Sequence, residues 1–161
     1  MNLDINTPRG QVSLQQERIL LDSARAAFPG VDFIETDKTG AAQVDGVMVK
    51  DNVVVGVYES KCRNLTKEQM HRYGDEWLVT YEKILGGIEV SKRLRVPFYG
   101  FIYFTREPIG AFIKIADEEG NILPQIRVAH TVTQMTVNGG SIVRENAYID
   151  LSSGFTFPIR I

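Results

Sequence analysis

Residues 42–61 have the sequence AQVDGVMVKDNVVVGVYESK, in which a short polar break separates two valine-rich segments. β-Branched residues favour strands, so residues 42–50 and 53–61 are predicted to form a hairpin. Side chains alternate between the faces of a strand, which places Glu59 and Lys61 on one face with valines before them. A buried carboxylate and ammonium destabilise a fold unless they are paired or meet a metal ion, so this face indicates a functional site or a strand end that reaches water.

The register of the hairpin decides whether a second carboxylate joins this face. If the loop comprises residues 50–52, Asp45 lies opposite Val57 and becomes a diagonal neighbour of Glu59 on the same face. Backbones of diagonal neighbours are about 7–8 Å apart, from where two carboxylates converge on one cation. A two-residue loop would place Asp45 on the other face. We therefore predict the three-residue loop.

The segments around the hairpin indicate an alternation of helices and strands. A capping pattern at Ser13 begins a helix that Pro29-Gly30 ends, and Thr66 caps a longer helix to about Gly86-Gly87. The order helix, three strands, helix, strand predicts an α+β fold with one mixed sheet flanked by helices. The predicted strands outside the hairpin are residues 31–36, 97–105, 109–116, 126–135 and 141–150.

Length and composition indicate one ordinary globular domain over residues 1–161. It is divided into a core over about 13–105 and a β-rich extension over about 106–161. No apolar run approaches the roughly 20 residues that span a bilayer, so no membrane partner is expected. The N-terminal residues lack a signal-peptide pattern, and Cys62 is the only cysteine, which favours a cytoplasmic location.

The charge distribution is compatible with binding to nucleic acid. The net charge of −2 argues against strong non-specific binding to DNA. Residues 61–95, however, contain eight basic and five acidic residues, a local excess of positive charge. Arg63, Lys67 and Arg72 belong to this stretch and are the candidates for contacts with DNA.

Two motifs resemble those of a known family. Asp45, followed fourteen residues later by Glu59-Ser60-Lys61 on the hairpin, resembles the signature of the PD-(D/E)XK nucleases, with Val44 where the family name places proline. Downstream, Gln69-Met-His-Arg-Tyr73 is similar to the Q-x-x-x-Y element of the RecB-type and lambda-exonuclease-like branch. The resemblance covers about residues 13–105 and implies a restriction-endonuclease-like αβββαβ core.

The resemblance implies a DNA nuclease that uses Mg²⁺, for which Mn²⁺ can substitute. Asp45 and Glu59 would bind the metal, Lys61 would assist the nucleophile, and Gln69 and Tyr73 would contribute to the active-site face. Phosphodiester hydrolysis fits this set, because Mg²⁺ held by one or two carboxylates activates water and stabilises charge on the phosphoryl oxygens. A lysine nearby offsets the developing negative charge.

Glu17 is a further candidate metal ligand. It interrupts an apolar stripe of the first helix between Leu14 and Phe28, and the resemblance implies that a glutamate of this helix reaches the metal. A boundary residue that pairs with Arg18 or Lys61 is the alternative interpretation.

Structural alternatives also exist for the Q-x-x-x-Y element. Gln69 completes a capping box with Thr66, and Tyr73 belongs to the apolar stripe of the predicted long helix. That stripe comprises Met70, Tyr73, Trp77, Tyr81 and Ile84.

Two other classes of function compete with the nuclease. One is a binding or assembly module that keeps the nuclease fold without catalysis, which the acidic net charge and the apolar C-terminus favour. The other is an all-β assembly protein, which rests only on residues 109–161. Within the nuclease interpretation, the small size and strand-rich end favour an enzyme that acts alone or as a homo-oligomer.

Overall fold

The computed structural model describes residues 7–37, 42–132 and 143–161, and these residues form an α+β fold. The elements are α1 (Pro8–Ala27), β1 (Asp32–Glu35), β2 (Gly46–Lys50), β3 (Val53–Arg63), α2 (Lys67–Arg72), β4 (Glu76–Thr80), α3 (Tyr81–Leu94), β5 (Phe98–Phe104), β6 (Ile109–Ala116), β7 (Ile126–Val132), β8 (Val143–Asp150) and β9 (Phe155–Pro158). The predicted α+β class is confirmed. No helix within the described ranges is long and apolar enough to cross a membrane.

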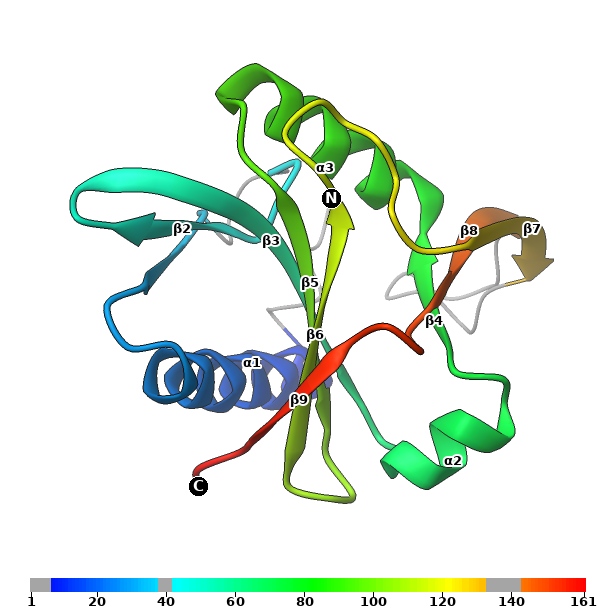
Figure 1. The fold of residues 1–161 in the computed structure, drawn as a ribbon. Helices are drawn as coiled ribbons and strands as arrows, with labels where there is room; N and C mark the ends of the chain where they lie inside the picture. Colours follow the sequence, from blue (N-terminus) through cyan, green and yellow to red (C-terminus); the bar gives the residue numbers. More distant parts are fainter. Residues whose placement is uncertain (1–6, 38–41, 133–142) are drawn as a thin grey trace.

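The main sheet is mixed and has six strands in the order β1-β2-β3-β5-β6-β9. β3 and β5 are parallel, and every other neighbouring pair is antiparallel. A parallel pair needs a crossover connection, which the segment from α2 to α3 provides (Figure 1). β5 is almost wholly buried in the middle of the sheet, as its unbroken apolar sequence predicts.

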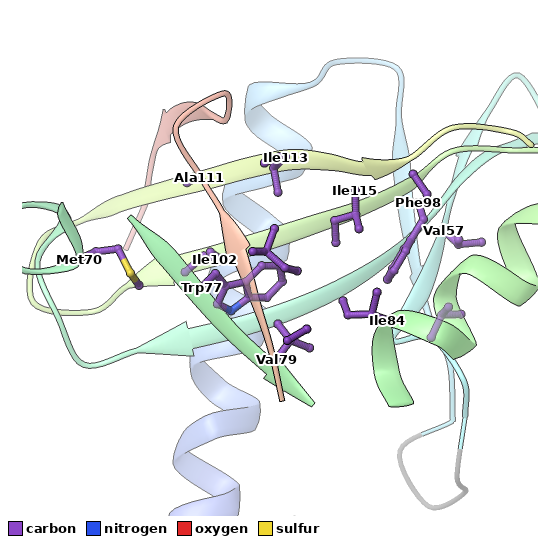
Figure 2. Close-up of a cluster of buried hydrophobic side chains, with 14 of the residues drawn as sticks. Val57, Met70, Trp77, Val79, Ile84, Phe98, Ile102, Ala111, Ile113 and Ile115 are labelled. Atoms are coloured by element: carbon purple, nitrogen blue, oxygen red, sulfur yellow. The ribbon is translucent and has the colours of Figure 1, made fainter. Parts of the chain in front are cut away.

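Different layers cover the two faces of the main sheet (Figure 1). α1 packs on one face, where buried aromatic and aliphatic side chains form what we term the aromatic core. α3 and the small sheet β4-β8-β7 cover the other face and enclose what we term the Trp77 core (Figure 2). Trp77 itself is fully buried against the main sheet.

The predicted long helix from Thr66 to Gly86-Gly87 is wrong. Thr66 does cap a helix, but α2 ends at Arg72, and Gly74 and Asp75 then adopt positive φ angles of 88° and 55°. Such angles break a helix and are most accessible to glycine and aspartate. The chain continues as β4, which pairs with β8, before it turns into α3.

The other predicted elements differ from the structure mainly at their ends. α1 begins at Pro8 with Thr7 as its N-cap, earlier than the predicted Ser13, because Thr-Pro supplies both a cap and a favoured first helical residue. β7 and β8 confirm the two late strands where they are described, whereas residues 133–142 lie outside the described ranges. The apolar C-terminal segment packs on the body of the molecule, because β9 pairs with β6.

Candidate active site

The turn between β2 and β3 has two residues, so the predicted three-residue loop is wrong. Asp51 and Asn52 have φ angles of 51° and 63°, and Lys50 pairs with Val53. Two successive positive φ angles are typical of a type I′ turn, whose twist matches that of the flanking strands. Asp and Asn tolerate this conformation better than most residues, which explains why the shorter turn forms.

A break in the register offsets the effect of the shorter turn. Val49 pairs with Val54 but Met48 pairs with Gly56, so Val55 is left over as a bulge residue on β3. Beyond the bulge, each residue of β2 pairs with a residue of β3 that lies one position further along the sequence than its partner in an unbroken hairpin with a two-residue turn. The predicted pairing of Asp45 with Val57 is therefore also wrong, since Val47 takes that place.

Asp45 directly precedes β2, and its side chain extends the hairpin beyond the last backbone pair. Its Oδ2 accepts a hydrogen bond from the backbone N–H of Ser60 at 2.8 Å and one from the Ser60 hydroxyl at 3.4 Å. Its own backbone is held by Tyr58 and Thr36, at 3.0 and 2.8 Å. Both side-chain bonds use Oδ2, so the carboxylate is fixed next to Glu59 while Oδ1 takes part in neither bond.

Glu59 is a fully buried carboxylate without a hydrogen bond. Its exposed fraction is 0%, and neither Oε1 nor Oε2 has a hydrogen-bond partner among the described residues. Lys61 Nζ lies 3.5 Å from Oε1, an ion-pair distance longer than an ordinary hydrogen bond. The Lys61 side chain is 35% exposed, so it connects the buried carboxylate with the surface.

The electrostatic environment of Glu59 opposes its ionisation. Burial raises the pKa of its carboxyl to about 7 and nearby Asp45 adds to this rise, whereas Lys61 and Lys83 counteract it. Asp45 directly before β2, Lys61 on β3 and Lys83 in the first turn of α3 thus all act electrostatically on Glu59. Perturbed carboxyl groups of this kind are enriched at functional sites.

Lys83 is a member of this group that the sequence did not single out. It lies in the first turn of α3, and its Nζ donates a hydrogen bond to the backbone oxygen of Ala42 at 3.3 Å. The sequence shows Lys83 only as one basic residue of a long predicted helix. Its position near Glu59 depends on β4, which reorients the chain before α3 begins.

The remaining predicted site residues lie elsewhere or have structural contacts. Glu17 acts electrostatically on Tyr58 and Cys62, which belong to the aromatic core on the face opposite Glu59. Within the described ranges, no three His, Cys, Asp or Glu side chains are close enough to hold one metal ion together. The structure thus brings Asp45 and Glu59 together but does not add Glu17 to them.

The Q-x-x-x-Y residues lie on α2 or at its end. Gln69 forms the capping box, in which its backbone N–H donates to Thr66 Oγ1 at 3.1 Å and its Oε1 accepts from the Thr66 backbone at 2.9 Å. Tyr73 is the C-cap of α2 and is 70% exposed, so it does not belong to the core. Their predicted contribution to an active-site face stays a prediction.

The three candidate DNA contacts differ in how freely they can meet a ligand. Arg63 Nη2 donates to the backbone oxygen of Leu78 at 2.7 Å, which ties its guanidinium to β4. Arg72 is exposed and pairs with Glu68 at 2.7 Å. Lys67 is exposed at the start of α2.

No protein-family model matches the chain, and no curated protein matches it. The functional argument therefore depends on the site itself. Asp45 and Glu59 suit a hard divalent cation, because Mg²⁺ usually takes one or two carboxylates and completes its shell with water and substrate oxygens. The two Glu59 oxygens without hydrogen bonds are acceptors that such an ion would satisfy.

Proposed function

We propose that this chain is a divalent-metal-dependent nuclease of the PD-(D/E)XK type that hydrolyses phosphodiester bonds of DNA, with Mg²⁺ as the metal and Mn²⁺ as a substitute. The observation that supports this most is Glu59, a fully buried carboxylate that receives no hydrogen bond within the described part of the chain, beside Asp45 and Lys61. Burial of a carboxylate destabilises a fold, and the single ammonium of Lys61 at 3.5 Å offsets this only in part, since the Glu59 pKa remains raised. A metal-binding role gives a reason for keeping it.

The architecture supports the same proposal. α1, β1 to β3, α3 and β5 follow one another in the order αβββαβ, with β5 parallel to β3. This order and pairing are what a restriction-endonuclease-like core requires, with α2 and β4 inserted between β3 and α3. We propose that the chain has this core, and that β6 to β9 extend its sheet and add the small second sheet.

The residues of the site have separable tasks in this proposal. Asp45 and Glu59 would hold the ion, and the Ser60 backbone keeps the Asp45 carboxylate in place. The bound ion would lower the pKa of a water molecule and stabilise negative charge on the phosphoryl oxygens. Lys61 holds its ammonium at the edge of the buried site, where it offsets the charge that develops on the phosphate.

The proposal is tested by incubating purified protein with linear, nicked and branched DNA in Mg²⁺ or Mn²⁺, with EDTA as the metal-free control. We expect cleavage by the wild type in either metal and none in EDTA. Glu59→Gln and Lys61→Ala should each reduce the rate at least about a hundredfold, since the first removes a carboxylate that would hold the ion and the second removes the ammonium that offsets charge on the phosphate. Glu119→Gln removes an exposed loop carboxylate and should leave the rate unchanged.

The contrary result is equally specific. If all three forms of DNA survive at micromolar wild-type protein in both metals, the nuclease proposal fails. A binding or assembly module built on the same fold then remains as the function.

A further inference from the structure

Lys83 lies at the wall of an open hollow beside the proposed active site. The hollow, which we term the α3 hollow, has a volume of about 540 Å³ and lies between residues 42–43 and the first two turns of α3. Gln43 approaches α3 so closely that a Cβ on Gly86 would come within 3.3 Å of its backbone oxygen. The wall of the hollow therefore begins two residues before Asp45.

The ammonium of Lys83 has hydrogen-bonding capacity that the protein leaves unused. An ammonium carries three N–H donors, and in the described residues Lys83 uses one, with the Ala42 backbone at 3.3 Å. Lys83 is only partly buried, and no carboxylate of the described residues lies within ion-pair distance of it. The other donors on the hollow wall are the Thr80 hydroxyl and the Gln43 amide.

We propose that Lys83 contacts a phosphate of the substrate strand next to the scissile bond, and that the α3 hollow receives the adjoining nucleotide. This inference depends on the proposed nuclease function and adds the place where the strand lies. Lys83 touches the substrate in this arrangement, so it is a binding residue of the site. Its backbone partner Ala42 orients the side chain toward the hollow.

Charge balance favours two ammonium groups at the site, those of Lys61 and Lys83, over one. When all four groups are ionised, Asp45, Glu59, Lys61 and Lys83 have a formal charge of zero, and a divalent ion brings the site to +2. The phosphodiester contributes −1, and the negative charge near −2 that develops during hydrolysis restores neutrality. Lys61 alone would leave the site one positive charge short.

The rest of the hollow wall limits where a phosphate can bind. Glu82 and Glu89 also lie on the wall, and Glu89 is paired with Arg93 at 2.9 Å. Glu82, which directly precedes Lys83, has no ion pair among the described residues, so it repels a phosphate and confines it to the Lys83 side of the wall. One phosphate at Lys83, with the nucleotide over Leu85 and Gly86, is the arrangement that the wall allows.

The salt dependence of DNA binding tests this inference independently of turnover. Binding of a fluorescein-labelled duplex is measured by anisotropy in Ca²⁺ and in EDTA over a range of salt concentrations, for the wild type, Lys83→Ala, Lys83→Gln, Lys83→Arg and Lys92→Ala. Lys92 is the matched control because it lies nine residues further along α3, on the opposite side of the helix, and is exposed. Loss of one phosphate contact lowers the slope of log K against log salt by about 0.9.

We expect Lys83→Ala and Lys83→Gln to show this reduction in slope and to bind DNA about five- to tenfold more weakly at low salt. Lys92→Ala should keep the wild-type slope and affinity, and Lys83→Arg should keep most of both. In cleavage assays the Lys83 variants should raise KM and also lower kcat, because the ammonium faces both the bound phosphate and the negative charge that develops on it. Lys83→Gln keeps a polar side chain, so its salt slope is compared with that of the wild type if Lys83→Ala fails to fold.

Two failures are distinguishable. If the wild type cleaves DNA but Lys83→Ala and Lys83→Gln keep its salt slope, the assignment of Lys83 is wrong and the nuclease proposal stands. If the wild type neither binds nor cleaves any DNA, the nuclease proposal fails, and the inference about Lys83, which depends on it, fails as well.

Discussion

Both faces of the six-stranded sheet bury apolar side chains, but among the described residues only the α3 side also buries a carboxylate. On the α1 side, aromatic rings pack edge to face or stacked around Phe101. On the α3 side, Glu59 shares a strand face with Val57 of the Trp77 core and is a buried carboxylate with no hydrogen bond from the described residues. Apolar burial stabilises the first face, whereas the second gives up stability to keep a charged group. The difference supports our proposal that the active site lies on the α3 side.

An unsatisfied polar atom alone does not separate the two faces. Tyr58 Oη on the α1 side also has no hydrogen-bond partner among the described residues. Burial raises the pKa of Tyr58 further above its usual value, so the hydroxyl stays neutral at physiological pH. The cost of burying a neutral hydroxyl is much smaller than that of burying an ion.

The largest expected effect on stability comes from the α1 side. Phe101→Ala should lower the free energy of unfolding by about 3–5 kcal/mol, because it removes a fully buried ring and leaves a cavity. Urea unfolding measures the change. Phe155→Ala is the control, since that ring is 66% exposed. Equal losses in the two variants would show that burial of the Phe101 ring does not account for the stability of the α1 side.

On the α3 side, Glu59→Gln is expected to stabilise the metal-free protein above neutral pH. Burial raises the pKa of Glu59 from 4.5 to about 7, so the folded state favours the protonated form. Wild-type stability should therefore fall as pH rises from about 4.5 to 7, with a loss of roughly 3 kcal/mol above that window. The glutamine is neutral at every pH and avoids this loss.

Urea unfolding in EDTA at pH 5 and pH 8 measures the effect. We expect Glu59→Gln to exceed the wild type clearly at pH 8 and only slightly at pH 5. Glu119→Gln, which replaces an exposed acid, should follow the wild type at both. A Glu59→Gln protein less stable than the wild type at pH 8 would show that the ionised carboxylate has a favourable partner in solution.

The sequence predicted elements well where local signals determine them. The alternation of valines marked β2 and β3, and the unbroken apolar run marked β5. β4 was missed because its strand conformation depends on β8, some seventy residues further along the chain. Gly74 and the residue after it were the only local signs that the helix ends early.

The site shows the same division between local and distant causes. Glu59 and Lys61 follow from strand alternation alone. The proximity of Asp45 to Glu59 was predicted from the wrong loop length. It arises instead through the bulge at Val55, which no residue pattern in the sequence predicts. Lys83 requires knowledge of how the chain returns to the hairpin after β4.

The smallest expected effect concerns α2, which contributes Met70 to the Trp77 core on the Glu59 side. If Gln69 acts only through the capping box, Thr66→Ala should cost about 1 kcal/mol of stability and Gln69→Ala no more than that. Neither should change the cleavage rate measured below the unfolding transition. A loss of cleavage in Gln69→Ala that Thr66→Ala does not share would place Gln69 in the active-site face, because both variants break the same cap. The functional side of the sheet would then extend from the hairpin to α2.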